Sequence, residues 1–130
     1  MHHFSRTLLA VIVSTAATCV YAQETPLPKE LSGRWSVPGT NLSDIFSLAE
    51  MVMGTDSTFT AKLTWWTPDR SCVIRSQPVS GRVTPTGITF DAKTKCDVAF
   101  TVELNRQEKA WAGKGNTTGG RLVLIELKAQ

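Results

Sequence analysis

Between Thr58 and Trp66, apolar and polar side chains alternate along the chain. A period of two is typical of a β-strand that buries one face, because successive side chains of a strand point to opposite sides. Further short segments of this kind follow, separated by turn residues such as Pro68-Asp69 and Pro85-Thr86-Gly87. About eight short strands with tight turns predict an all-β fold, in which one small antiparallel up-and-down meander closes into a barrel.

One segment, Asp44 to Met53, fits two kinds of structure. Its apolar residues include a set spaced three or four apart, so that Asp44 would cap a helix with one apolar stripe. As a strand, Phe46, Leu48 and Glu50 would share a face with Val52. We favour the strand, which the turn after Met53 would pair back with the Thr58–Trp66 strand as a hairpin.

Residues 1–22 have the layout of a secretory signal peptide. Arg6 gives a positive start, Leu8 to Val13 form an apolar stretch, and Val20-Tyr21-Ala22 is a small-residue cleavage site. The apolar stretch falls short of the ~20 residues that a membrane-spanning helix needs. We therefore predict a periplasmic or secreted protein, cleaved after Ala22 and without a membrane span. Residues 23–30, with two prolines, are then a flexible arm, and residues 31–130 form the barrel domain.

The cysteines predict one disulfide. Cys19 leaves with the signal, and Cys72 and Cys96 remain in the exported chain. An even number of cysteines in an exported domain indicates a bridge between them. Cys72, Ile74 and Ser76 alternate with Val73 and Arg75, which predicts a strand beside the first of these cysteines.

Several functional classes are disfavoured by composition. Both histidines, His2 and His3, lie in the predicted signal, so the mature chain has no base for Ser-His-Asp or Cys-His catalysis. Two cysteines without histidine do not make a four-ligand zinc site, and we expect no metal or other cofactor. After cleavage, 13 Lys and Arg stand against 11 Asp and Glu, a net charge of +2 without a basic run. A charge of this size and distribution does not predict a surface that binds nucleic acid. The carboxylates are scattered over separate segments, so we interpret them as solvent-exposed residues and predict no catalytic residues.

The tryptophans are the residues that a ligand site would use. Trp65 and Trp66 are adjacent, so one points into the barrel and the other lies outside or at a rim. Trp111, between two alanines, could line a pocket. The alternative roles are structural: Trp66 covers a barrel end near Pro68, and Trp111 fills the space left by its small neighbours.

The segment Leu31-Ser32-Gly33-Arg34-Trp35 resembles the Gly-x-Trp motif with which lipocalins and other calycins begin their small barrels. The resemblance implies that Gly33 and Trp35 help to close one end of the barrel. It also implies that Arg121, at the start of the last strand, packs across the indole of Trp35, a contact worth roughly 0.5–2 kcal/mol. The size of the chain is similar to that of avidins and of periplasmic inhibitors of metalloproteases or lysozymes.

These observations predict an exported, non-enzymatic binding protein. In the first version a small apolar ligand binds in the mouth of the barrel, with Trp65, Trp66 and Trp111 as binding residues. In the alternative version the protein is a periplasmic protease or lysozyme inhibitor. It would then bind a protein partner through residues 23–30 and the loops, because Leu27 to Trp35 looks like the arm and first strand of the metalloprotease inhibitors.

Overall fold

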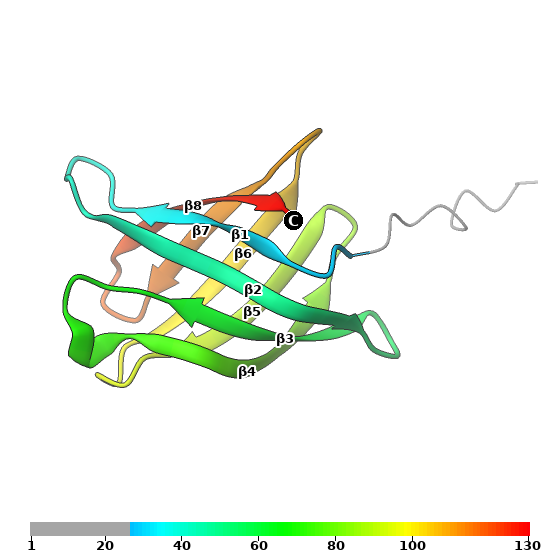
Figure 1. Ribbon diagram of the computed structural model, residues 1–130, viewed down its shortest axis with the longest axis horizontal. Coiled ribbons are helices and arrows are strands. Elements are labelled where there is room, and N and C mark those ends of the chain that lie inside the picture. The colour runs from blue at the N-terminus through cyan, green and yellow to red at the C-terminus, as the bar shows by residue number, and fades with distance from the viewer. Residues whose placement is uncertain (1–26) are drawn as a thin grey trace, which may run out of the picture.

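The computed structural model describes residues 27–130, which form one closed barrel of eight antiparallel strands (Figure 1). The predicted all-β up-and-down barrel is confirmed, since the strands follow one another around it in chain order. The predicted signal, residues 1–22, and the first part of the predicted arm, residues 23–26, lie outside the described residues. The strands are β1 (Leu31–Ser36), β2 (Ser43–Met53), β3 (Thr58–Trp65), β4 (Ile74–Val83), β5 (Gly87–Lys93), β6 (Ala99–Arg106), β7 (Trp111–Thr117) and β8 (Leu122–Ala129).

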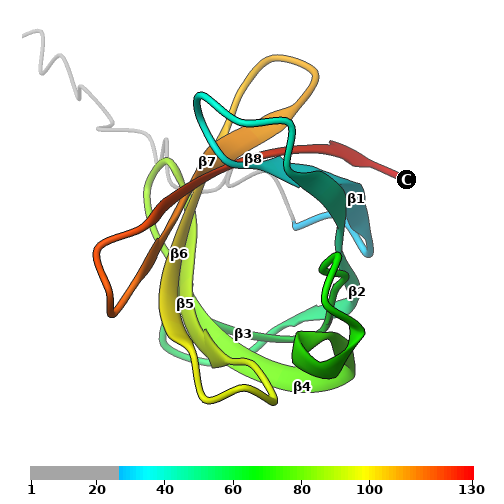
Figure 2. The ribbon, with the colours of Figure 1, turned by 90° about the vertical axis from the view of Figure 1, so that its left-hand side faces the viewer.

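The first and last strands close the barrel. Each strand pairs with the next, and β1 pairs with β8 along its whole length (Figure 2). Gly33 lies in this seam, where an added Cβ would stand 2.0 Å from the carbonyl oxygen of Glu126. That distance is far below a normal contact, so only glycine lets the two backbones approach this closely. Both Gly33 and Trp35 therefore lie on the strand that completes the ring of strands.

Side chains fill the inside of the barrel. Burial alternates along β3 as the sequence predicts, with Phe59, Leu63 and Trp65 buried. Inward side chains from all eight strands join one apolar cluster, which contains no buried polar or charged residue among the described residues. The space inside the ribbon in Figure 2 is thus a packed core, as expected for a barrel of eight strands.

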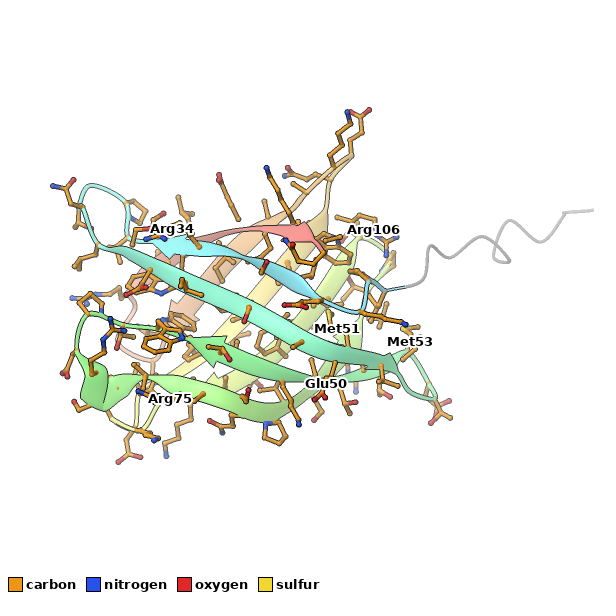
Figure 3. All side chains as sticks on the ribbon, viewed as in Figure 1. Arg34, Glu50, Met51, Met53, Arg75 and Arg106 are labelled. Atoms are coloured by element: carbon orange, nitrogen blue, oxygen red, sulfur yellow. A yellow bond between two sulfur atoms is a disulfide. The ribbon has the colours of Figure 1, made fainter. Side chains whose placement is uncertain are left out.

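The segment from Asp44 to Met53 is a strand, and its alternation is interrupted by a β-bulge. The register between β2 and β3 shifts between Ala49 and Val52. Glu50 adopts a φ of 51° there, so its side chain turns outward and pairs with Lys62 at 2.9 Å. Met51 takes the inward position instead (Figure 3). The expectation that Glu50 and Val52 share the face of Phe46 was wrong, because the extra residue reverses the alternation.

A second bulge changes the start of β4. Val73 and Ile74 are both buried, while Ser76 is exposed with a φ of 44°. The register against β3 shifts here, and the Ser76 N–H is bonded to the hydroxyl of Thr64 at 3.2 Å instead of to the strand ladder. The predicted alternation of Cys72, Ile74 and Ser76 was therefore wrong.

A disulfide joins Cys72 and Cys96, as predicted. Cys72 ends η2 (Arg70–Cys72), a short 3-10 helix in the β3–β4 loop, and Cys96 lies in the β5–β6 loop. The bond therefore links two loops at the same end of the barrel. Among residues 27–130, no helix is long and apolar enough to cross a membrane.

Candidate functional site: the mouth of the barrel

Four loops surround one end of the barrel, which we call the mouth: residues 37–42, 66–73, 94–98 and 118–121. Figure 2 looks onto this end. The opposite end is formed by loops 54–57, 84–86 and 107–110, and residues 27–30 also lie there. Leu27 packs against the core, and the carbonyl of Lys29 accepts a hydrogen bond from the Met51 N–H at 3.0 Å. The described part of the arm is thus attached to the barrel at the end away from the mouth.

The mouth contains a cavity of about 320 Å³. The cavity forms where the packed core ends. There, the inward side chains at the ends of several strands are covered only by loops. Trp35 at the end of β1, Trp65 at the end of β3 and Phe100 near the start of β6 form its aromatic floor. The remaining lining residues are Val37, Leu42, Thr67, Pro68, Asp69, Cys72, Thr94, Val98, Thr117, Arg121 and Val123.

Trp65 is the centre of the aromatic floor. Its ring centroid lies 4.2 Å from that of Phe100, 5.3 Å from that of Phe46 and 5.7 Å from that of Trp35. The indole N–H of Trp35 donates a hydrogen bond of 2.7 Å to the carbonyl of Trp66. This bond satisfies the polar edge of the Trp35 indole, and it fixes the ring in the floor.

The rim of the cavity is apolar on two sides. Leu42 and Val98 stand on different loops and remain 43% and 39% exposed. Apolar side chains that face an opening and stay exposed are available to a ligand. The sequence did not single out these residues, and only the structure shows that they line the same cavity as Trp65.

Two charged residues line the cavity, Asp69 and Arg121. Asp69 caps η2: one carboxylate oxygen accepts hydrogen bonds from the Ser71 hydroxyl at 2.7 Å and from the Ser71 N–H at 3.0 Å. These two bonds, the hydroxyl first, hold the pKa of Asp69 below its usual value, because they favour the ionised carboxylate. Asp69 is therefore an anion that is already committed to the loop.

The structure separates the three tryptophans that the sequence proposed for ligand binding. Trp65 lies in the floor of the mouth, whereas Trp66 is half-buried on the outer side of the barrel. The guanidinium carbons of Arg70 and Arg75 lie 4.6 and 5.1 Å from the Trp66 ring centroid. Arg75 is labelled in Figure 3. These contacts tie the start of β4 to the β3–β4 loop.

Trp111 lies at the start of β7, next to the opposite end of the barrel. It is buried in the core, and the guanidinium carbon of Arg106, which Figure 3 labels, lies 5.0 Å from its ring centroid. Trp111 therefore fills the core and does not line the mouth cavity, so the three predicted residues do not form a single site.

Arg121 does not stack on Trp35. Within residues 27–130, the guanidinium–indole contacts involve Trp66 and Trp111 only. The register explains the difference, because Trp35 pairs with Ile125, four residues after Arg121 and about 13 Å further along the strand at ~3.3 Å per residue. Arg121 stands instead in the turn before β8, where it lines the same cavity as Trp35.

The residues around the disulfide offer little to a metal ion. A carboxylate oxygen of Asp69 and the sulfurs of Cys72 and Cys96 lie within 4.8 Å of one another. Both sulfurs are bonded to each other, and a disulfide has no thiolate to act as a ligand. In this oxidised form the cluster supplies a single exposed carboxylate.

A larger groove of about 590 Å³ lies outside the barrel, across β1, β7 and β8. Its lining combines three charged residues, Arg34, Glu126 and Lys128, with apolar ones that include Trp35, Trp111 and Leu127. The mouth cavity is smaller, but its floor is made of the aromatic side chains that end the core. A small apolar molecule therefore finds the better complement in the mouth.

The chain is similar in fold to two solved β-barrels. One is a de novo designed fluorescence-activating β-barrel, with a TM-score of 0.55 and 16% identity over 80% of this chain and 94% of that chain. The other is a redesigned β-barrel, with the same TM-score and identity over 80% of this chain and 91% of that chain. No protein-family model matches the sequence, and no curated protein matches it either. At this identity, the likeness shows that the chain has the fold of a small closed barrel.

Proposed function

We propose that this protein is an exported, non-enzymatic binding protein that holds a small apolar ligand in the mouth of its barrel. The observation that carries the proposal is the cavity of about 320 Å³ over Trp35, Trp65 and Phe100. Its size is at the lower end of the range for small-molecule sites, and such sites are lined mainly by apolar and aromatic side chains. The first of the two barrels of similar fold is described as fluorescence-activating.

The filled core limits where the ligand binds. Phe46, Leu48 and Leu63 are fully buried below the aromatic floor, so they leave no path into the barrel. The ligand would lie between this floor and the rim residues Leu42 and Val98. We therefore expect a molecule of modest size, held at one end of the barrel and partly exposed to solvent.

Two observations support export. Residues 1–22 have the sequence layout of a signal peptide. The Cys72–Cys96 bond belongs to the kind of disulfide that persists in the periplasm or outside the cell. Detection of an N-terminus at Gln23 in exported protein would test this part of the proposal, and an intact Met1 in that fraction would contradict it.

The ligand site is tested with N-phenylnaphthylamine, a neutral apolar dye whose fluorescence rises in apolar surroundings. The mouth variant is Leu42→Ser with Val98→Ser. Removing two half-exposed apolar side chains should cost roughly 1.5 kcal/mol of apolar contact with the dye. This loss of binding free energy raises the Kd of the dye about tenfold. The matched control is Val52→Ser with Met53→Ser, which removes side chains of 58% and 43% exposure at the opposite end.

The control variant should bind the dye as the wild type does. Equal loss in the two variants would place dye binding outside the mouth, and a wild type without saturable binding would refute the ligand proposal. A variant that lacks residues 23–26 addresses the inhibitor alternative. It keeps the packing of Leu27 and should keep dye binding, because the arm is attached at the other end. Loss of a protease or lysozyme partner on this deletion would favour the inhibitor.

A further inference from the structure

We infer that the mouth selects ligands that combine an aromatic or other flat apolar body with one negative charge, such as a carboxylate or sulfonate, and that Arg121 binds this charge. The inference rests on the proposed function and specifies its ligand class. Three features support it: the hydrogen-bond and ion-pair partners of the two charged lining residues, the net charge of the surrounding loops, and the aromatic floor.

The guanidinium of Arg121 is the uncommitted charge at the cavity. The backbone of Arg121 is fixed in the β7–β8 turn: its N–H donates to the Thr117 hydroxyl at 3.0 Å, and its carbonyl accepts from the Thr117 N–H at 3.0 Å. No ion pair among the described residues involves its side chain. Asp69, the other charged lining residue, already accepts two hydrogen bonds from Ser71. An anion in the cavity would therefore meet a guanidinium without an ion-pair partner, and Asp69, which remains negative, would be the one opposing charge of the lining.

The mouth loops have an excess of positive charge. Asp97 lies 3.4 Å from Lys93, so its charge is largely offset by that lysine. The other charged residues of the four loops are Arg70, Lys95, Arg121 and Asp69. Three cations against one carboxylate give a local field that favours a negatively charged ligand over a positive one.

The position of Arg121 relative to the floor fixes the expected shape of the ligand. The rings of Trp65 and Phe100 lie 4.2 Å apart at 59°, which makes an angular apolar wall for a flat group. Arg121 lines the same cavity from the turn before β8, whereas Val123 in β8 is buried. A ligand would thus place its apolar body on the floor and its charge at the rim, in water-accessible surroundings where the charge need not be fully desolvated.

The experiment compares two dyes that share one ring system. Anilinonaphthalene sulfonate carries a sulfonate that N-phenylnaphthylamine lacks, so the pair isolates the charge. At low ionic strength, Arg121→Gln should weaken binding of the sulfonate dye about five- to tenfold, and it should change the Kd of the neutral dye by less than about twofold. Arg121→Lys, which keeps the charge and loses the flat fork, should recover part of the affinity. High salt should remove most of the difference between wild type and Arg121→Gln.

Arg82→Gln is the matched control, because Arg82 is an exposed arginine of β4 at the end away from the mouth. It should leave the affinity for both dyes unchanged. An equal effect of Arg82→Gln would show a general effect of net charge and would overturn the inference. An unchanged affinity of Arg121→Gln for the sulfonate dye would also overturn the inference. In that case, weaker binding of the neutral dye by the Leu42→Ser/Val98→Ser variant would still support the mouth as the ligand site. If neither dye binds the wild type, the proposed function itself fails. Urea melts establish that each variant is folded, and the exposed Arg121 side chain makes this the expected result.

Discussion

Removal of the disulfide should cost this barrel about 3.5 kcal/mol of stability. Cys72 and Cys96 are 24 positions apart, and closing a loop of that length lowers the entropy of the unfolded chain. The chain-entropy relation gives about 12 cal/mol/K, or about 3.5 kcal/mol at 25 °C. Cys72 is half-buried and Cys96 is exposed, so replacing both by alanine removes little buried surface. The bond itself should therefore account for most of the loss.

The measurement is equilibrium unfolding in urea of the Cys72→Ala/Cys96→Ala variant and of oxidised wild type, followed by tryptophan fluorescence. We expect a lower free energy of unfolding and a larger m-value, because the unfolded chain without the bond is more expanded. The thermal midpoint should fall by roughly 15 °C for a domain of about 100 residues. Reduced wild type is the control, because it lacks the bond without any change of sequence. A loss below about 1 kcal/mol in both forms would refute the entropic argument.

Three further predictions concern single residues. Trp35→Phe should cost about 1–3 kcal/mol in a urea melt, because the carbonyl of Trp66 loses its 2.7 Å partner; an unchanged midpoint would show that water replaces the bond. Gly33→Ala should cost at least about 1–3 kcal/mol, since the new methyl group would force β1 from β8, and a neutral effect would contradict the close approach in the seam. Asp69→Asn should lower stability at neutral pH and have less effect in acid. The hydrogen bonds from Ser71 lower the folded-state pKa of Asp69, so their contribution to stability is present above the unfolded pKa near 3.8. This contribution is lost as pH falls through the lower folded-state pKa, and a destabilisation by Asp69→Asn that does not change with pH would count against the linkage.

The strands and the disulfide could be predicted because their signals are local. The alternation from Thr58 to Trp66 follows from spacing along the chain, and the disulfide from the presence of two cysteines, Cys72 and Cys96, outside the predicted signal. The two bulges could not be predicted in this way. Glu50 and Ser76 adopt positive φ values without being glycine or asparagine, the residues that usually mark such a backbone. Pairing with the neighbouring strands determines these conformations, and the sequence of one strand does not show it.

The candidate site was predicted in part. The sequence identified Trp65 as a residue that a ligand could use, and it grouped Trp65 with two tryptophans that lie elsewhere. Which residues line the mouth cavity depends on which inward-facing residue is the last in each strand, and on which loops lie at that end of the barrel. Both depend on the register of all eight strands. Leu42 and Val98, from loops that are far apart in the sequence, line the same cavity for this reason.

The seam between β1 and β8 has a consequence for how the chain folds. Seven of the eight pairings join successive strands, whereas the eighth places Leu31 opposite Ala129, 98 positions later. A contact so distant in sequence raises the contact order and slows folding, because bringing the two ends together costs loop-closure entropy before the contact can stabilise them. Whenever the seam is open, β1 and β8 present two unpaired strand edges that another copy of the chain can join. The seam is therefore the part of this barrel where strand exchange between copies, and aggregation during folding, should begin.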